Sequence, residues 1–569
     1  MKKIVVCLMI IGWFGFLNAQ HQSKTFPKGY FRAPIGIPMY LAGNFAELRP
    51  NHFHSGIDIK TNGSEGYRVY AAADGYVSRI KISPYGYGKA IYIDHPNGYT
   101  TVYAHLSKFK GAINDFIFNE QTNQESFEID VYLPDSTLLV KKGEVIALSG
   151  NSGSSGGPHL HFEIRNTKTE HALNPLLFGF DIKDDLKPTI KSVAVYPIDN
   201  SSVVNNKNEK LIIKAKGING NYQPVLDELN VYGNIGIGIE VEDHLNGTPN
   251  RNGVYSIELY DNEELIFKHQ LDSFSFDETR CMNAHLDFAT KLKENIRLQR
   301  TFKLPNNYLS SYKVVKNNGI IVIGDKEEHH IKIIVKDAYL NTSTVQLKLK
   351  GQQKQIQVAQ PKGFFWKYDI ANHFENEDIK VYVPENSLYQ NIYFEYETSE
   401  QIKYNIVKTH HVHNWYEPLD KPIKISLHVP NLESSLKNKA VIVYQDERGK
   451  YYSKGGEWTG NYITTESKNF GLYGVMIDTI PPNVKPVNIY NNKYIGGQST
   501  IVVEIADNLS GIKSYKGYID GKFVIFEYEP KKRVLIYYKE GLEKGAHQLQ
   551  LTVTDGVGNE SNLYLDFKN

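Results

Sequence analysis

The sequence predicts an all-β protein made of several domains. Its 569 residues include 39 tyrosines and 26 phenylalanines, and aromatic residues favour strands. Short segments that alternate apolar and polar residues recur along the chain, separated by turns rich in Asp, Asn and Gly. A chain of this length has room for about three to five domains. We therefore expect an N-terminal β-domain followed by several β-sandwich modules.

A pair of histidines marks one expected strand. Residues 159–164 read His-Leu-His-Phe-Glu-Ile after Pro158. Side chains of a strand alternate between its faces, so His159, His161 and Glu163 share one face and the apolar residues take the other. This spacing predicts that both imidazoles project from a sheet in the same direction.

A second motif carries a histidine and an aspartate four residues apart. It runs from His54 through Ser, Gly56 and Ile to Asp58. A strand that extends back to His54 would place both polar side chains on one face, and a helix would also align them. Gly56 and the turn-like residues 61–63 favour a strand that runs into a turn.

These residue types suit a catalytic zinc site. Neutral imidazoles and a carboxylate bind the ion and leave a position for water. His105, between the two motifs in the segment Tyr103-Ala-His-Leu, adds a further histidine that can handle protons. Four histidines and one aspartate are thus available for metal binding and proton transfer.

The stretch from about residue 30 to 180 resembles the lysostaphin-type (LytM) zinc metallopeptidases, which cleave peptide bonds in peptidoglycan. The resemblance rests on motifs that occur in the family's order: Arg49, 54–58, 71–77, 86–88, 103–107, 140–146, 150–153, 157–163 and 174–175. It implies a folded-over hairpin catalytic β-domain (the duplicated hybrid motif). It also implies that His54, Asp58 and His161 bind Zn²⁺, and that His105 and His159 assist the zinc-bound water and the oxyanion, with their roles undivided.

Two other interpretations of these motifs are possible. A catalytically silent relative characteristically loses ligands, whereas all five positions are kept here. The hairpins also resemble biotinyl and lipoyl carrier domains, but no modifiable lysine motif is evident. His52 is interpreted as a flanking residue, His95 as part of a hairpin turn, and Tyr103 as an alternating strand residue.

One segment departs from the compact family pattern. Residues 108–139 stand where a short connection is expected, and they contain two apolar stretches, 116–118 and 127–132. We expect extra strands or a groove wall here, because surface loops tolerate insertions and carry specificity.

The N-terminus is typical of a secreted protein. Lys2 and Lys3 precede an apolar run that ends at Leu17, and Ala19 supplies a small residue for cleavage, which predicts a signal peptide over residues 1–19. The run is short for a membrane span, and no later stretch is long enough for one, so no transmembrane segment is expected in the mature chain. Without the signal peptide only Cys281 remains, which excludes an internal disulfide. The implied location is periplasmic or associated with the cell envelope.

The net charge argues against nucleic acid as a partner. Lys and Arg number 64 against 63 Asp and Glu, so the chain lacks the basic excess that binds phosphates. Bulk charge would not hold it to anionic polymers either, so wall targeting would need a specific site.

A weak internal repeat lies in the remaining chain. Its matching pairs are 188–193 with 482–487, 239–243 with 503–507, His329/Asp337/Asn341 with His547/Asp555/Asn559, and 345–349 with 563–567. The repeat predicts an immunoglobulin-like sandwich over 186–350, with extra material, and another over 481–569, on either side of a β-rich sandwich over 351–480. The catalytic domain would then occupy 20–185.

Two further groups of polar residues have simpler explanations than metal binding. The histidines of 410–413 lack an accompanying carboxylate or cysteine arrangement, so we interpret them as strand residues. Asp507-Asn508 and the run from Asp555 to Asn559 could bind calcium, but Asx turns explain them more simply.

The sequence thus predicts a secreted zinc endopeptidase that acts on peptidoglycan stems or cross-links. The sandwiches would position it, bind an envelope protein, or cover the site until needed. The alternatives are a catalytically silent regulator of another wall hydrolase and an envelope interaction protein.

Overall fold

The computed structural model describes residues 26–226, 228–356 and 361–569. The predicted signal peptide, residues 1–19, lies outside them. Strands dominate this part of the chain, which confirms the all-β prediction. The α-helices in it are short, and none is long and apolar enough to cross a membrane: α1 (Gly111–Asn123), α2 (Met282–His285), α3 (Phe288–Glu294) and α4 (Ser434–Lys437).

The N-terminal domain is built on an antiparallel sheet. Its neighbours run in the order β1 (Leu41–Gly43), β4 (Ile57–Lys60), β12 (His159–Asn166), β8 (Tyr99–Phe109), β7 (Lys89–Asp94), β6 (Gly75–Ile82) and β10 (Leu139–Val140). Leu160, Phe162 and Ile164 of β12 are buried in the core, as their alternation predicts. The opposite face of β12 is therefore left for His159, His161 and Glu163.

The insertion at 108–139 forms a helix and a strand. Residues 116–118 lie in α1, whose Ile113 and Ile117 pack against the core, so the expectation of strands is wrong for that stretch. β9 (Ile129–Tyr132) does add a strand, because it pairs with β6. The predicted hairpin turn at His95 is confirmed, since it joins the paired strands β7 and β8.

The second domain is a sandwich formed mainly by long antiparallel strands. The strands that build it include β14 (Thr189–Pro197), β16 (Leu211–Ile218), β18 (Glu228–Glu242), β19 (Ser256–Asp261), β20 (Glu264–Gln270), β25 (Glu328–Lys336) and β26 (Thr342–Gly351). Their inward-facing Ile, Val and Leu residues form a separate hydrophobic core.

Two smaller sandwiches complete the chain. The third has five-stranded sheets centred on β33 (Ile423–His428) and β38 (Gly471–Ile477). The fourth packs a sheet with β41 (Thr500–Ala506), β44 (Phe526–Glu529) and β45 (Val534–Tyr538) against one with β42 (Ile512–Ile519), β46 (Ala546–Asp555) and β47 (Glu560–Lys568). Each has its own core. We propose that these four cores mark four domains with the boundaries expected from the sequence.

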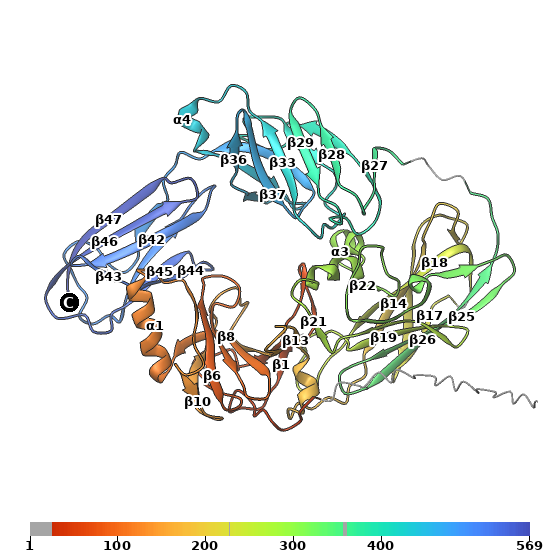
Figure 1. Cartoon of the computed structure of the whole chain (residues 1–569), viewed down its shortest axis with the longest axis horizontal. Helices are drawn as coiled ribbons and strands as arrows, with labels where there is room; N and C mark the ends of the chain where they lie inside the picture. Colours follow the sequence, from red (N-terminus) through yellow and green to blue (C-terminus); the bar gives the residue numbers. More distant parts are fainter. Residues whose placement is uncertain (1–25, 227, 357–360) are drawn as a thin grey trace, which may run out of the picture.

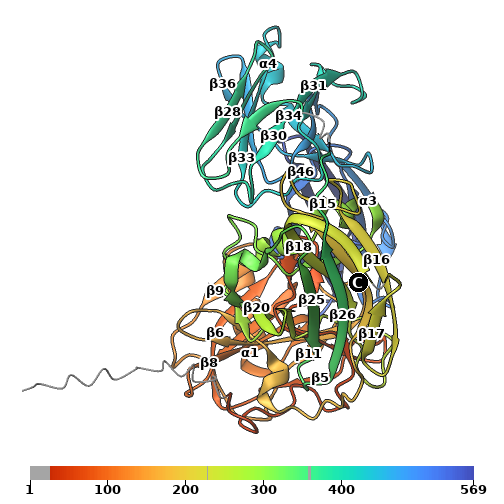
Figure 2. The ribbon, with the colours of Figure 1, turned by 90° about the vertical axis from the view of Figure 1, so that its right-hand side faces the viewer.

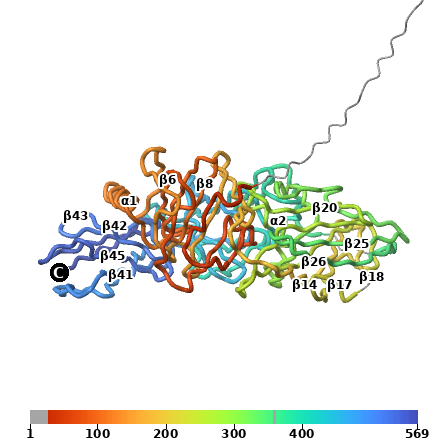
Figure 3. Tube along the Cα trace, turned by 90° about the horizontal axis from the view of Figure 1, so that it is seen from below, coloured from red at the N-terminus to blue at the C-terminus, as the bar shows by residue number. Residues whose placement is uncertain are grey.

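The four domains follow one another around a ring (Figure 1). Seen from the side, the third domain stands above the first two (Figure 2), and seen from below the first lies between the fourth and the second (Figure 3). A shared apolar cluster joins the first domain to the second, and Tyr389 of the third reaches into it. Tyr515 and Ile525 of the fourth domain pack against the core of the first, which closes the ring.

Candidate metal centre

Two neighbouring strands place an aspartate opposite a histidine. β4 pairs antiparallel with β12, and the register sets Asp58 directly across from His161. Directly paired residues of antiparallel strands have Cβ atoms about 4.5–5.5 Å apart. Both side chains are buried, at 6% and 3% exposed. The pairing therefore fixes their approach before any ligand binds.

His54 reaches the same point from a bend. β3 (His52–Phe53) and β4 are interrupted at residues 54–56, so the expected continuous strand from His54 to Asp58 is wrong. Gly56 sits in the bend against β12, where a Cβ would come within 2.3 Å of the carbonyl oxygen of Phe162. Glycine is required because the backbone of the bend approaches β12 too closely for any side chain.

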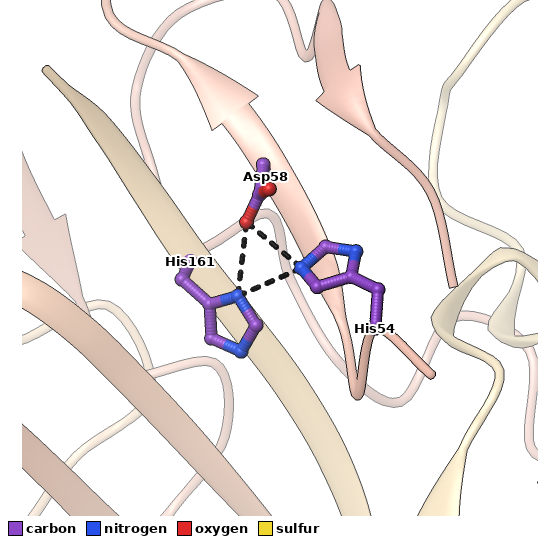
Figure 4. A group of neighbouring side chains, drawn as sticks. All are labelled: His54, Asp58 and His161. Carbon is purple, nitrogen blue, oxygen red and sulfur yellow. Dashed lines mark hydrogen bonds and ion pairs between the residues drawn. The ribbon is translucent and has the colours of Figure 1, made fainter. Parts of the chain in front are cut away.

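Three lone-pair donors converge in a triangle (Figure 4). His54 Nε2 lies 3.0 Å from Asp58 Oδ1 and 3.1 Å from His161 Nδ1, and Asp58 Oδ1 lies 2.9 Å from His161 Nδ1. Tetrahedral zinc ligands with bonds of about 2.0–2.1 Å are separated by roughly 3.3 Å. These separations therefore fit a zinc-sized ion after a small outward shift.

Hydrogen bonds on the far sides of the rings fix the tautomers. His54 Nδ1 lies 2.7 Å from the carbonyl oxygen of Asn44, which can only accept, so Nδ1 carries the proton. His161 Nε2 donates to Glu163 Oε1 at 2.8 Å. Each ring therefore turns its other nitrogen, the one that can bind a metal, toward Asp58. Such carboxylate or carbonyl partners orient histidine ligands in metal sites.

The second oxygen of Asp58 has a different partner. Arg49 Nη2 donates to Asp58 Oδ2 at 2.8 Å and to Glu47 Oε2 at 3.0 Å. This contact leaves Oδ1 to face the two imidazoles. Asp58 is thus arranged to offer a single oxygen to an ion.

The charges of the site favour a bound cation. Burial opposes ionisation of Asp58, but His54 and hydrogen bonds from His159 and His161 hold its pKa well below the usual range. Burial likewise opposes a charged His161, but hydrogen bonds to Asp58 and Glu163 raise its pKa to about 9. Without metal, His161 thus holds a proton between itself and Asp58, and a metal ion would replace that proton.

His159 borders the triangle without completing it. His159 Nε2 lies 3.3 Å from Asp58 Oδ1, while its Nδ1 lies 2.8 Å from the carbonyl oxygen of Gly157. Because that carbonyl only accepts, Nδ1 carries a proton and Nε2 is the nitrogen that faces Asp58.

His105 reaches the site through an irregular backbone. Strict alternation along β8 would turn it into the core with Tyr103, but its φ is +59° and the register with β7 shifts nearby. A bulge of this kind redirects a side chain. The His105 ring lies 4.7 Å from that of His159, and its Nδ1 bonds the carbonyl of Ser152 at 2.9 Å, which leaves Nε2 unprotonated.

The remaining residues weighed from the sequence lie elsewhere. His52 is exposed and bonds the carbonyl of Pro50, and Tyr103 is fully buried in the core. The histidines of 410–413 belong to or follow β32 (Thr409–Val412), where His410 bonds Tyr396 and His411 bonds Ser399. Within the described ranges they join no group of metal-binding residues. Their interpretation as strand residues is confirmed.

Sequence reasoning missed two supports of the ligands. Glu163 was placed on the face of His161 but given no role, although it is fully buried and bonds both His161 and Arg165. Its position two residues after His161 was the available signal. No signal in the sequence pointed to Asn44, because its backbone carbonyl, not its side chain, contacts His54. The Asn44 side chain instead bonds the backbone N–H and the carbonyl of the distant Gly253.

Comparison with known proteins agrees with this geometry. A model described as peptidase family M23 matches residues 52–122 and 134–175, and one described as a Zu5-like domain matches 364–478. An uncharacterized metalloprotease of Haemophilus influenzae is 34% identical over 164 residues, which cover 27% of this chain and 28% of the relative. Peptidoglycan DD-endopeptidase ShyB of Vibrio cholerae is 34% identical over 111 residues, 20% of each chain.

The likeness covers only part of each protein. The chain spans less than a third of the length of these curated relatives. Among solved structures, the catalytic domain of lysostaphin from Staphylococcus simulans is 25% identical over 25% of this chain and 91% of its own, with a TM-score of 0.19. The gap in the family match, 123–133, falls inside the insertion. The first domain of this chain is thus similar to peptidase family M23 over residues 52–122 and 134–175.

Proposed function

We propose that this protein is a secreted zinc endopeptidase that hydrolyses peptide bonds in the stems or cross-links of peptidoglycan. His54 Nε2, Asp58 Oδ1 and His161 Nδ1 would hold the ion. Two imidazoles and one carboxylate are the donor set of several catalytic zinc sites, which keep a position open. The observation that carries the proposal is the convergence of these three atoms with both histidine tautomers already fixed.

Bound zinc would supply a Lewis acid for the scissile carbonyl and a water whose pKa is lowered to about 7. His159 and His105 each bond a backbone carbonyl through Nδ1, which leaves Nε2 to handle a proton. Such a nitrogen can accept a proton from the attacking water and return it to the leaving amine. When protonated, it can also donate to the oxyanion of the tetrahedral intermediate.

The substrate proposal rests on the family domain and on the name of the Vibrio relative. An endopeptidase acting on the wall would need to be exported, which agrees with the predicted signal peptide over residues 1–19. The sandwich domains are proposed to position the catalytic domain or to contact another envelope protein.

Digestion of isolated sacculi tests the proposal. The purified zinc-loaded chain should release soluble muropeptides and reduce cross-linked species, while His161→Ala should release none. Asp135→Asn provides a control, because Asp135 is exposed on the insertion. A folded, zinc-loaded protein that leaves the muropeptides unchanged would favour a silent regulator of another hydrolase.

A further inference from the structure

Three aspartates meet where the first domain joins the second. Asp184 lies on the connection out of the first domain, Asp243 follows β18, and Asp337 follows β25. One carboxylate oxygen from each lies within 4.8 Å of the other two. Asp243 and Asp337 are each only 1% exposed. Three acidic side chains are therefore gathered at a place that water reaches poorly.

One of these carboxylates lacks a partner. Asp243 Oδ1 is buried without a hydrogen bond although it is grouped with the other two carboxylates. The charged groups that act most strongly on Asp243 and Asp184 are other carboxylates, which raise both pKa values in addition to the effect of burial. A buried, unpaired carboxylate is costly, and a bound cation is one of the few arrangements that relieve it.

The same arrangement recurs where the third domain joins the fourth. Asp478 lies on the connection after β38, Asp507 follows β41, and Asp555 ends β46. Their carboxylates are again grouped within 4.8 Å, and Asp507 Oδ1 is again buried without a partner. The two clusters occupy corresponding positions of the internal repeat, so the feature belongs to the repeated unit.

The surroundings of the two clusters also match. Asn341 Nδ2 bonds the carbonyl of Asp184 at 3.2 Å, and Asn559 Nδ2 bonds the carbonyl of Asp478 at 3.1 Å. The predicted Asx turn at Asp555 is confirmed, because its Oδ1 accepts a bond from the amide of Val557 at 3.0 Å. This turn does not exhaust the acceptor capacity of the carboxylate, because an ionised carboxylate has about four lone-pair sites.

We propose that each cluster binds a divalent cation with a preference for oxygen ligands, namely calcium. Calcium takes oxygen ligands at about 2.3–2.6 Å in flexible geometries, so two ligands on opposite sides of the ion lie roughly 4.6–5.2 Å apart. Because the carboxylate oxygens of each cluster lie within 4.8 Å of one another, all three can reach one ion with bonds of this length. Magnesium demands shorter bonds in a near-ideal octahedron and keeps more of its water.

The position of each site gives the cation a structural role. In each cluster one aspartate comes from the connection to the preceding domain and two come from the end of the sandwich. The turn after Asp337 packs Tyr339 against the core of the first domain, and Val557, after Asp555, packs against the third. A bound ion would thus set the angle between neighbouring domains and help to hold the ring closed.

Calcium titration of the full chain tests this proposal independently of catalysis. With the catalytic site preloaded with zinc, calorimetry with Ca²⁺ alone should show about two equivalents, with a Kd on the order of 10⁻⁵ to 10⁻³ M. Asp243→Asn and Asp507→Asn should each remove one equivalent, and the double variant both. Asp135→Asn, an exposed control, should keep two.

Small-angle scattering supplies a second readout. Calcium should narrow the distribution of interdomain distances in the wild-type chain but not in the double variant. If Asp243→Asn fails to fold, Asp184→Asn tests the first site at a less buried position. Unchanged stoichiometry in folded variants, absence of binding up to 10 mM calcium, or tighter binding of Mg²⁺ than of Ca²⁺ would overturn the proposal.

Discussion

His161 donates its Nε2 proton to Glu163 at 2.8 Å, and this bond turns Nδ1 toward His54 and Asp58. Glu163 is fully buried and also accepts a bond of 2.6 Å from Arg165. The pKa of Glu163 is lowered because Arg165 and His161 outweigh the effect of burial. The carboxylate therefore stays ionised and fixes the orientation of His161, a proposed metal ligand.

Replacing Glu163 by Gln should weaken metal binding by about 10–100-fold, the range found for partners of ligating histidines. It should also lower stability by roughly 3–5 kcal/mol, because the buried Arg165 loses its counter-charge. Competition with a fluorescent zinc chelator measures the affinity, and urea unfolding measures the stability. Glu128→Gln, at an exposed position, should change neither. Wild-type affinity in a folded Glu163→Gln protein would exclude the orienting role.

The four histidines should separate into two classes. His161→Ala should abolish both metal binding and peptidoglycan hydrolysis, because it removes one of three ligands. His159→Ala should retain close to one equivalent of zinc yet lose about 10²–10⁴-fold in rate, the usual contribution of a general acid or base. Metal analysis of the purified variants beside a muropeptide assay distinguishes these results. Loss of zinc from His159→Ala would instead make His159 a ligand.

The sequence brought the proposed ligands together, but it did not predict their surroundings. Alternation along β12 gave the correct face for His159, His161 and Glu163, because a buried strand fixes which residues point inward. His105 departs from strand alternation, because its positive φ turns the side chain away from the core. No residue pattern in the sequence predicts that bulge. Its role was available from the family resemblance alone.

Contacts between domains were equally hidden in the sequence. Phe53, beside the proposed metal ligand His54, packs against Phe274 of the second domain. In the sequence each phenylalanine looks like an ordinary strand residue. Alternation predicts that a side chain is buried, but it does not predict which domain covers it. The repeat did match Asp243 with Asp507 and Asp337 with Asp555, whereas the approach of Asp184 and Asp478 to these residues required the folded chain.

The fourth domain should steady a loop of the metal centre. Lys531 Nζ donates to the carbonyl of Asn151 at 2.5 Å and to that of Ser155 at 3.3 Å. The same loop accepts hydrogen bonds from His105 at Ser152 and from His159 at Gly157.

Lys531→Ala should therefore speed hydrogen exchange across residues 151–157, with smaller changes elsewhere in the first domain. Hydrogen–deuterium exchange with mass spectrometry measures this directly. Lys544→Ala removes an exposed lysine of the same domain and is the matched control. Equal exchange in both variants would show that docking of the fourth domain does not restrain the loop.

Without calcium, the first aspartate cluster should make stability depend on pH. Burial, with the neighbouring Asp184 and Asp337, raises the pKa of Asp243 to about 9. The other titratable groups that face this cluster are Asp185, which acts on Asp184, and Tyr339, whose pKa Asp184 and Asp337 raise. Because the raised pKa lets the folded state keep a proton that the unfolded state releases, this stabilising contribution is complete below about pH 4. It is lost progressively as the pH rises toward about 9.

Melting temperatures in calcium-free buffer should therefore fall more steeply from pH 5 to pH 9 for the wild type than for Asp243→Asn. Comparing the wild type with Asp243→Asn removes the contribution of all groups that titrate equally in the two proteins. Millimolar calcium should remove most of the decrease in the wild-type melting temperature, because the ion replaces the proton as the partner of the carboxylates. Calcium should change the melting temperature of Asp243→Asn less, because the variant lacks one carboxylate of the first cluster. Parallel curves for the two proteins, with and without calcium, would show that Asp243 neither holds a proton nor binds the ion in the folded state.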